Sequence, residues 1–98
     1  MKEPNYRYRE DQFLAEALDH VKSTYGAHYA MVDEQQIFDV WEGMGIEIES
    51  CLSNISKYAH RFGKKSGYNK KDVYKMIHYA LIMLHYVEKR GLAEDSDK

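Results

Sequence analysis

Residues 51–84 read CLSNISKYAHRFGKKSGYNKKDVYKMIHYALIML, and this stretch decides the fold. Apolar residues recur at helical spacing on both sides of a central loop that contains two glycines. Gly63 follows the first run at the place of a helix C-cap, and Asn69 precedes the second run as an N-cap. The stretch therefore predicts two helices joined by a short basic loop, which is an antiparallel helical hairpin.

The apolar positions on either side of the loop define the two hairpin helices. The first carries its apolar face from about Ile48 to Phe62, and the second continues to about Arg90 and ends at Gly91. The predicted core positions are Ile48, Cys51, Leu52, Ile55, Ala59 and Phe62 in the first helix, and Val73, Met76, Ile77, Ala80, Leu81, Leu84 and Val87 in the second.

Two further helices are expected before the hairpin. Apolar spacing predicts one from about Glu10 to Thr24, ending before Gly26. The other is expected to open at Asp33, with Gln36 in the relation of a capping box, and to be interrupted by Gly43 and Gly45. The sequence thus predicts an all-α single domain over residues 1–98, with two short helices, a long antiparallel hairpin and an acidic tail at 92–98.

The last predicted helix is apolar over much of its circumference. Several residues lie partly off its main stripe or that of its hairpin partner: Tyr58, Tyr74, Tyr79, Ile82, Met83 and Tyr86. A homo-oligomer would cover this second apolar face. The alternative is that the other helices of the same chain wrap around it.

Charge is concentrated in one segment. The 98 residues carry a net charge of −2, but seven lysines and arginines stand against Asp72 alone between Lys57 and Lys75. That segment is therefore at +6 and the remaining residues at −8. This asymmetry favours a local anion site over a long nucleic-acid track.

The sequence lacks the residues that several functional classes need. Cys51 is the single cysteine, so a disulfide-stapled secreted scaffold is excluded. No apolar stretch follows the first charged residues, and the longest purely apolar run is 80–84, so we expect neither a signal peptide nor a membrane span but a cytosolic protein. The sequence around Gly63-Lys64-Lys65-Ser66 lacks the first glycine and the strand of a P-loop.

Metal and nucleophilic chemistry are also poorly supported. His78 and His85 share a helix face, but no further metal-ligand motif accompanies them, and we expect interface or surface residues. Glu42, Glu47 and Glu49 lack the spacing of magnesium-binding acidic helices. We therefore expect no metal, no cofactor and no catalytic nucleophile.

Lys57 and Arg61 lie four residues apart on one polar strip of the first hairpin helix, and Lys64 and Lys65 follow on the loop. An ammonium, a forked guanidinium and the backbone N–H groups of a glycine-flanked turn suit phosphate oxygens. The other interpretation, left open by these residues, is a solvated basic surface that balances the acidic remainder.

The order of these features resembles the SaV-like family of small bacteriophage proteins, often labelled phage nucleotide kinase. The likeness covers about residues 27–84 and follows H-Y, then G-N-x-x-K-Y-x-x-R-x-G-x-K, then D-L-x-K-A-x-x-Y. The chain departs from this pattern at Ser53, Val73 and Met76, which stand in place of glycine, leucine and alanine. Together with Lys64, the residues that the resemblance implies as ligand-binding are His28, Tyr29, Asn54, Lys57, Tyr58, Arg61, Lys65, Asp72 and Lys75.

The resemblance implies an oligomeric phage protein of the host cytoplasm that binds a nucleotide or a nucleotide-derived immune signal. Binding or sequestration in an anti-defense role is expected over turnover, because no base, nucleophile or metal cage is evident beside the cations. One alternative is a nucleoside-monophosphate kinase without a P-loop, in which Lys57 and Arg61 stabilise the transferred phosphoryl group. Another is a module that binds nucleic acid or a host protein.

Overall fold

The computed structural model describes residues 3–26 and 28–94, and side chains at positions 26–35 lie outside the description. The described residues form four helices and no strand, so the predicted all-α class is confirmed. The helices are α1 (Glu10–Gly26), α2 (His28–Met44), α3 (Glu47–Arg61) and α4 (Lys70–Lys89).

The first two helices differ from the prediction. α2 begins at His28, so Asp33 lies inside the helix and the predicted capping box was wrong. Neither glycine nor proline occurs between His28 and Asp33, so no residue there opposes the earlier start. α1 likewise continues to Gly26. Both helices have 17 residues against 15 in α3 and 20 in α4, so the prediction of two short helices beside a longer hairpin was also wrong.

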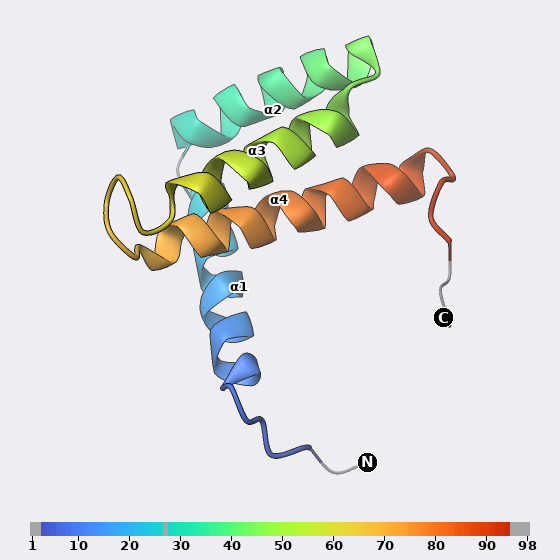
Figure 1. The fold of residues 1–98 in the computed structure, drawn as a ribbon. Coiled ribbons are helices and arrows are strands. Elements are labelled where there is room, and N and C mark those ends of the chain that lie inside the picture. The colour runs from blue at the N-terminus through green and yellow to red at the C-terminus, as the bar shows by residue number, and fades with distance from the viewer. Residues whose placement is uncertain (1–2, 27, 95–98) are drawn as a thin grey trace.

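The predicted antiparallel hairpin of α3 and α4 is confirmed (Figure 1). Its turn follows from local signals. Gly63 has a φ of +82° just after the α3 C-cap, and the Asn69 side chain accepts a hydrogen bond from the Lys71 backbone N–H at 2.9 Å. At the other end of α3, Gly45 has a φ of +73° and separates α2 from α3, as the glycine pair predicted.

The core of the hairpin is small. Cys51 is fully buried, and Tyr58 and Tyr86 are each 8% exposed. The buried Glu47 at the start of α3 holds Arg90 at the end of α4, with 3.2 Å between Oε1 and Nη1. Burial, with a smaller contribution from the charge of Glu47, raises the pKa of the Cys51 thiol to about 11.

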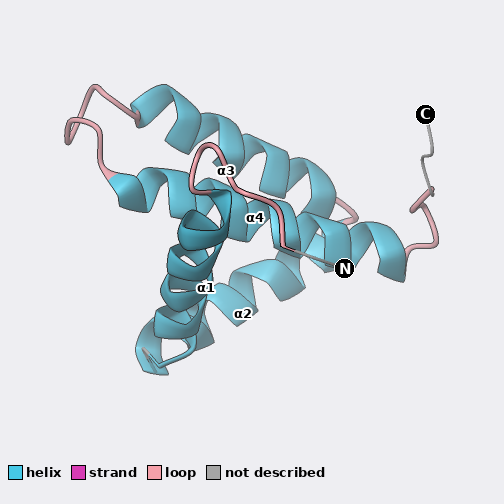
Figure 2. Ribbon diagram, turned by 90° about the horizontal axis from the view of Figure 1, so that it is seen from below, coloured by secondary structure: helices cyan, strands magenta, loops and turns pink. Residues whose placement is uncertain are grey.

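α1 and α2 lie on one side of the hairpin (Figures 1 and 2). α1 crosses the other helices steeply, and its Glu16 carboxylate accepts hydrogen bonds from the Tyr74 hydroxyl at 2.6 Å and from Lys70 at 3.2 Å. Glu42 of α2 pairs with Lys89 of α4. The two helices are thus fastened to α4 by polar side chains.

Because the hairpin is covered on one side only, several predicted core residues are exposed. Leu52 is 50% exposed, Leu84 is 58% exposed, and Ala59 is also exposed. Leu81 is exposed as well, but on the side that faces α1 and α2. Tyr58 and Tyr86, which the sequence placed off the main stripes, are buried instead.

None of the helices in residues 3–26 and 28–94 combines the length and apolar character that a bilayer crossing requires.

Candidate functional site

Three basic side chains converge on the ring of Tyr58. The ring centroid lies 4.6 Å from Lys57 Nζ, 5.0 Å from Lys75 Nζ and 5.8 Å from Arg61 Cζ. Lys57 and Arg61 come from α3 with Tyr58, and α4 brings Lys75 to the same ring. The electron-rich face of a tyrosine attracts cations, which explains how like charges are held together here. We refer to these four residues as the Tyr58 cluster.

The Tyr58 cluster carries positive charge that no described carboxylate neutralises. The salt bridges among the described residues involve Lys70, Lys89 and Arg90. Three adjacent cations repel one another, and a bound anion would offset that repulsion. The arrangement thus has the chemistry of a site for phosphate or another multivalent anion.

The remaining predicted ligand residues are not drawn into the cluster by any described contact. Asn54 Nδ2 donates to the Ser50 carbonyl at 2.9 Å, within α3. Lys65 is exposed, and Lys64 Nζ lies 3.4 Å from His60 Nδ1. His28 and Tyr29 belong to the first turn of α2, but their side chains lie outside the described residues.

Asp72 occupies the first turn of α4 and is 6% exposed. Its Oδ2 atom has no hydrogen-bond partner among the described residues. Leaving a buried carboxylate oxygen without a hydrogen bond costs free energy in a folded protein. This oxygen is therefore able to accept a hydrogen bond from another group.

Three of the loop's backbone N–H groups, which the sequence suggested for an anion, are used within the turn. The Gly63 N–H donates to the Gly67 carbonyl at 2.9 Å, and those of Lys64 and Lys65 donate to the Arg61 carbonyl at 3.0 and 3.3 Å. For these three N–H groups the expectation was wrong, because they donate to carbonyls within the turn. The predicted anion chemistry therefore depends on side chains.

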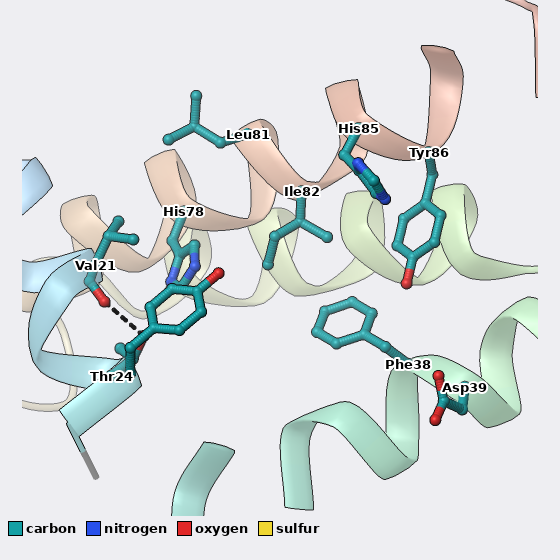
Figure 3. A pocket seen from close by; sticks show the side chains of 10 residues that line it. Val21, Thr24, Phe38, Asp39, His78, Leu81, Ile82, His85 and Tyr86 are labelled. Atoms are coloured by element: carbon teal, nitrogen blue, oxygen red, sulfur yellow. Dashed lines mark hydrogen bonds between the residues drawn. The ribbon is translucent and has the colours of Figure 1, made fainter. Parts of the chain in front are cut away.

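Two adjoining cavities lie between the hairpin and the first two helices. The smaller, about 140 Å³, is lined by Tyr58 and Lys75 of the Tyr58 cluster. The larger, about 530 Å³, contains none of the predicted ligand residues. Thr24, Phe38, His78 and Ile82 line both, so the two cavities lie side by side. Figure 3 shows the larger cavity between α4, α1 and α2, with Phe38 and Tyr86 turned toward each other.

Aromatic rings connect the basic end of this cleft to the larger cavity. Tyr58 stacks on Tyr79 with 6.2 Å between centroids, and Phe38 follows at 6.2 Å from Tyr79 and 6.1 Å from Tyr86. Burial is the main cause of the raised pKa of Tyr86, so its hydroxyl is neutral at ordinary pH. The cleft therefore has one end at Tyr58 and Lys75 of the cluster and an aromatic end that the acidic Asp39 also lines.

The wall that α1 contributes depends on Glu16. Hydrogen bonds from the Tyr74 hydroxyl, then Gln12 and Lys70, lower the pKa of Glu16 to about 2. The same contact raises the pKa of Tyr74. At neutral pH the carboxylate is ionised and keeps α1 against α4.

Sequence reasoning missed most of the large cavity. His78 and His85 line it and are not simply surface residues. Their seven-residue spacing was the available signal, but Thr24 and Phe38 carry no local motif. In the part of the chain that the structure describes, no three histidine, cysteine or acidic side chains gather in a way that could hold a metal ion.

The comparisons with known proteins identify a family. A family model described as a protein of unknown function, DUF3310, matches residues 22–81, which include the whole Tyr58 cluster and Phe38. No curated protein and no solved structure matches the chain. Because the matched segment is more than half of the 98 residues, the chain belongs to the DUF3310 family.

Proposed function

We propose that this protein binds a nucleotide or a nucleotide-derived signal in the cleft between the hairpin and helices α1 and α2. The phosphates would contact Lys57, Arg61 and Lys75, and the base would lie in the larger cavity against Phe38 and Tyr86. The observation that carries the proposal is the position of the Tyr58 cluster, whose Tyr58 and Lys75 line the smaller cavity, directly beside the larger aromatic cavity.

The chemistry of the two ends matches the two parts of a nucleotide. Ammonium and guanidinium groups bind phosphate oxygens by charge-assisted hydrogen bonds. Aromatic side chains bind any base by stacking, at about 1–3 kcal/mol for each base. Two ring-to-ring steps of 6.2 Å lead from Tyr58 to Phe38, so a single small molecule can contact both ends.

Binding is favoured over turnover in this proposal. The described residues of the Tyr58 cluster supply cations and a ring. Among the described residues that line the cleft, the Thr24 hydroxyl donates to the Val21 carbonyl at 2.7 Å and is not paired with a base as nucleophilic catalysis needs. In line with the resemblance to small bacteriophage proteins, the protein would act as a homo-oligomer in the host cytoplasm and sequester the signal that it binds.

The direct experiment is to release bound small molecules from the purified protein by heat and identify them by mass spectrometry. We expect a nucleotide to be released. We also expect fresh or refolded protein to bind that nucleotide again in calorimetric titration. An empty protein that binds no mononucleotide, dinucleotide or cyclic nucleotide would overturn the proposal. Tight binding of single-stranded DNA or RNA instead would favour a nucleic-acid module.

A further inference from the structure

The side of the α3–α4 hairpin that faces away from α1 and α2 is apolar and uncovered. In Figure 1 no other helix lies in front of α3 and α4, and Figure 2 places α1 and α2 on their opposite side. We call this side the bare face. By helical spacing, the α4 residues opposite the cavity-lining His78 and Ile82 are Val73, Ile77, Ala80, Leu84 and Val87; Leu84 is 58% exposed and the other four are half-buried.

These five residues follow one another at intervals of four, three, four and three along α4. Such spacing places them on one helix face, and it is the repeat by which helices pack against a partner helix. On α3, Ile48, Leu52 and Ile55 repeat the same spacing and, by the antiparallel packing of the hairpin, turn to the same side. Two parallel apolar rows of this kind are half of a four-helix bundle.

The row on α4 is nearly symmetric about its centre. Valine stands at both ends, isoleucine and leucine come next, and the small Ala80 is in the middle. In a two-fold symmetric contact, an antiparallel pair of identical helices sets each residue against its mirror position in the row. Val73 would then face Val87, Ile77 would face Leu84, and Ala80 would lie at the axis, where a small side chain lets the helices approach.

The exposed area of the chain is consistent with a missing partner. The chain exposes 7894 Å², whereas a compact monomer of its mass exposes about 5,800 Å². The difference is larger than the ~800 Å² that each partner contributes to a standard interface.

We propose that the bare face binds the same face of a second copy of this chain, with α4 antiparallel to its counterpart and crossing it at Ala80. This differs from the sequence-based expectation, which assigned self-association to Tyr79, Ile82, Met83 and Tyr86. Tyr86 is buried within the chain, Tyr79 stacks on Tyr58, and Ile82 lines both cavities. The ligand cleft lies on the other side of the hairpin, so the proposal does not depend on the proposed function.

The first test compares Leu84→Glu with Leu18→Glu by light scattering at micromolar concentration. Both leucines are more than half exposed, and Leu18 is on α1, away from the bare face. We expect about twice the chain mass of 11.6 kDa for the parent protein and for Leu18→Glu. Leu84→Glu should have the mass of one chain and keep its helical circular dichroism. A parent protein that is monomeric, or a Leu84→Glu variant that keeps the mass of the parent, would overturn the proposal.

The second test locates the axis. Under mild oxidation Ala80→Cys should form a disulfide between two copies, because the axis sets the residue beside its own counterpart, within the short Cα separation that a disulfide requires. Cys51 is buried and does not interfere. Leu18→Cys is the control and should stay unlinked. Equal linkage of the two variants, or none in Ala80→Cys, would exclude this geometry.

Discussion

The α3–α4 hairpin and the α1–α2 pair are held in place by different means. The hairpin closes over buried Cys51 and Tyr58 and is locked at its open end by the ion pair of Glu47 and Arg90. α1 and α2 are fastened to α4 by partly exposed polar contacts, through Glu16 and Glu42, and by the Phe38 ring against Tyr79 and Tyr86. The cleft lies between these two parts, so a ligand that fills it supplies packing that the free protein lacks.

The largest expected effect separates a core side chain of the hairpin from an apolar side chain of α1. Tyr86→Ala should lower the free energy of unfolding by about 3–5 kcal/mol, because it empties a buried aromatic site. Leu18→Ala should change it by less than about 0.5 kcal/mol, because Leu18 is exposed. Urea unfolding followed by circular dichroism measures both. Similar losses for the two variants would mean that the stability difference between the two parts does not exist.

Next in size are the substitutions at the cationic end of the cleft. Arg61→Ala and Lys57→Ala should each remove a charge-assisted hydrogen bond of about 1.5–3 kcal/mol, a roughly tenfold to hundredfold loss of affinity for a phosphate ligand. Lys57 is exposed and Arg61 half-buried at the edge of the hairpin, so the fold should be kept. Calorimetric titration measures the affinity.

Lys22→Ala is the matched control, because Lys22 is an exposed lysine on α1. Arg61→Lys should recover only part of the affinity, since an ammonium cannot make a two-pronged contact. If Arg61→Ala binds as tightly as the parent protein, the basic segment is only a solvated surface.

A smaller effect should appear in acid, at the attachment of α1. The pKa of Glu16 falls from 4.5 to about 2 on folding, so its contribution to stability is complete above pH 4.5 and is lost as the pH falls toward 2. The stability difference between the parent protein and Glu16→Gln should therefore be present at pH 6 and shrink over that range. Urea unfolding at a series of pH values measures it.

Asp19→Asn, at an exposed site on α1, should show no comparable loss. A Glu16→Gln difference that is the same at pH 2 as at pH 6 would contradict the role of the Tyr74 and Lys70 contacts.

The smallest expected effect is on phosphoryl transfer, which we expect the protein not to catalyse. Mixed with a nucleoside monophosphate and ATP, the protein should form no diphosphate product, because the proposed site offers cations and aromatic rings for binding. Chromatography of the nucleotides measures this. Steady product formation that disappears in Lys57→Ala would replace sequestration by the kinase alternative.

The hairpin was predictable because its signals are local. Gly63, Asn69 and Gly91 each mark a helix end by their own backbone preference, and all three do so in the structure. Which face of α4 is buried was harder to predict, because Tyr86 and Leu84 lie on different sides of a helix that is apolar nearly all round. Tyr86 is buried and Leu84 exposed because α1 and α2 cover only one side, which helical periodicity alone does not encode.

The candidate site was predictable in its charge and not in its shape. Lys57, Arg61 and Lys75 were identified from the concentration of basic residues, and the structure brings them to one ring. The cavity needs Thr24 from α1, Phe38 from α2 and His78 from α4. These residues are distant in sequence and each is ordinary for its helix, so only the packing of three helices reveals them.

The turn at Gly63 bears on the entropic cost of binding an anion at the Tyr58 cluster. A side chain at this position would meet the Tyr68 ring, 2.7 Å from Cε1, and that ring in turn packs edge-on against Phe62 with 5.4 Å between centroids. The ring contacts of Tyr68 therefore tie the loop to the end of α3. The cations of the Tyr58 cluster stand on α3 and α4 and not on this loop, so an anion bound as proposed would not have to order a loop segment.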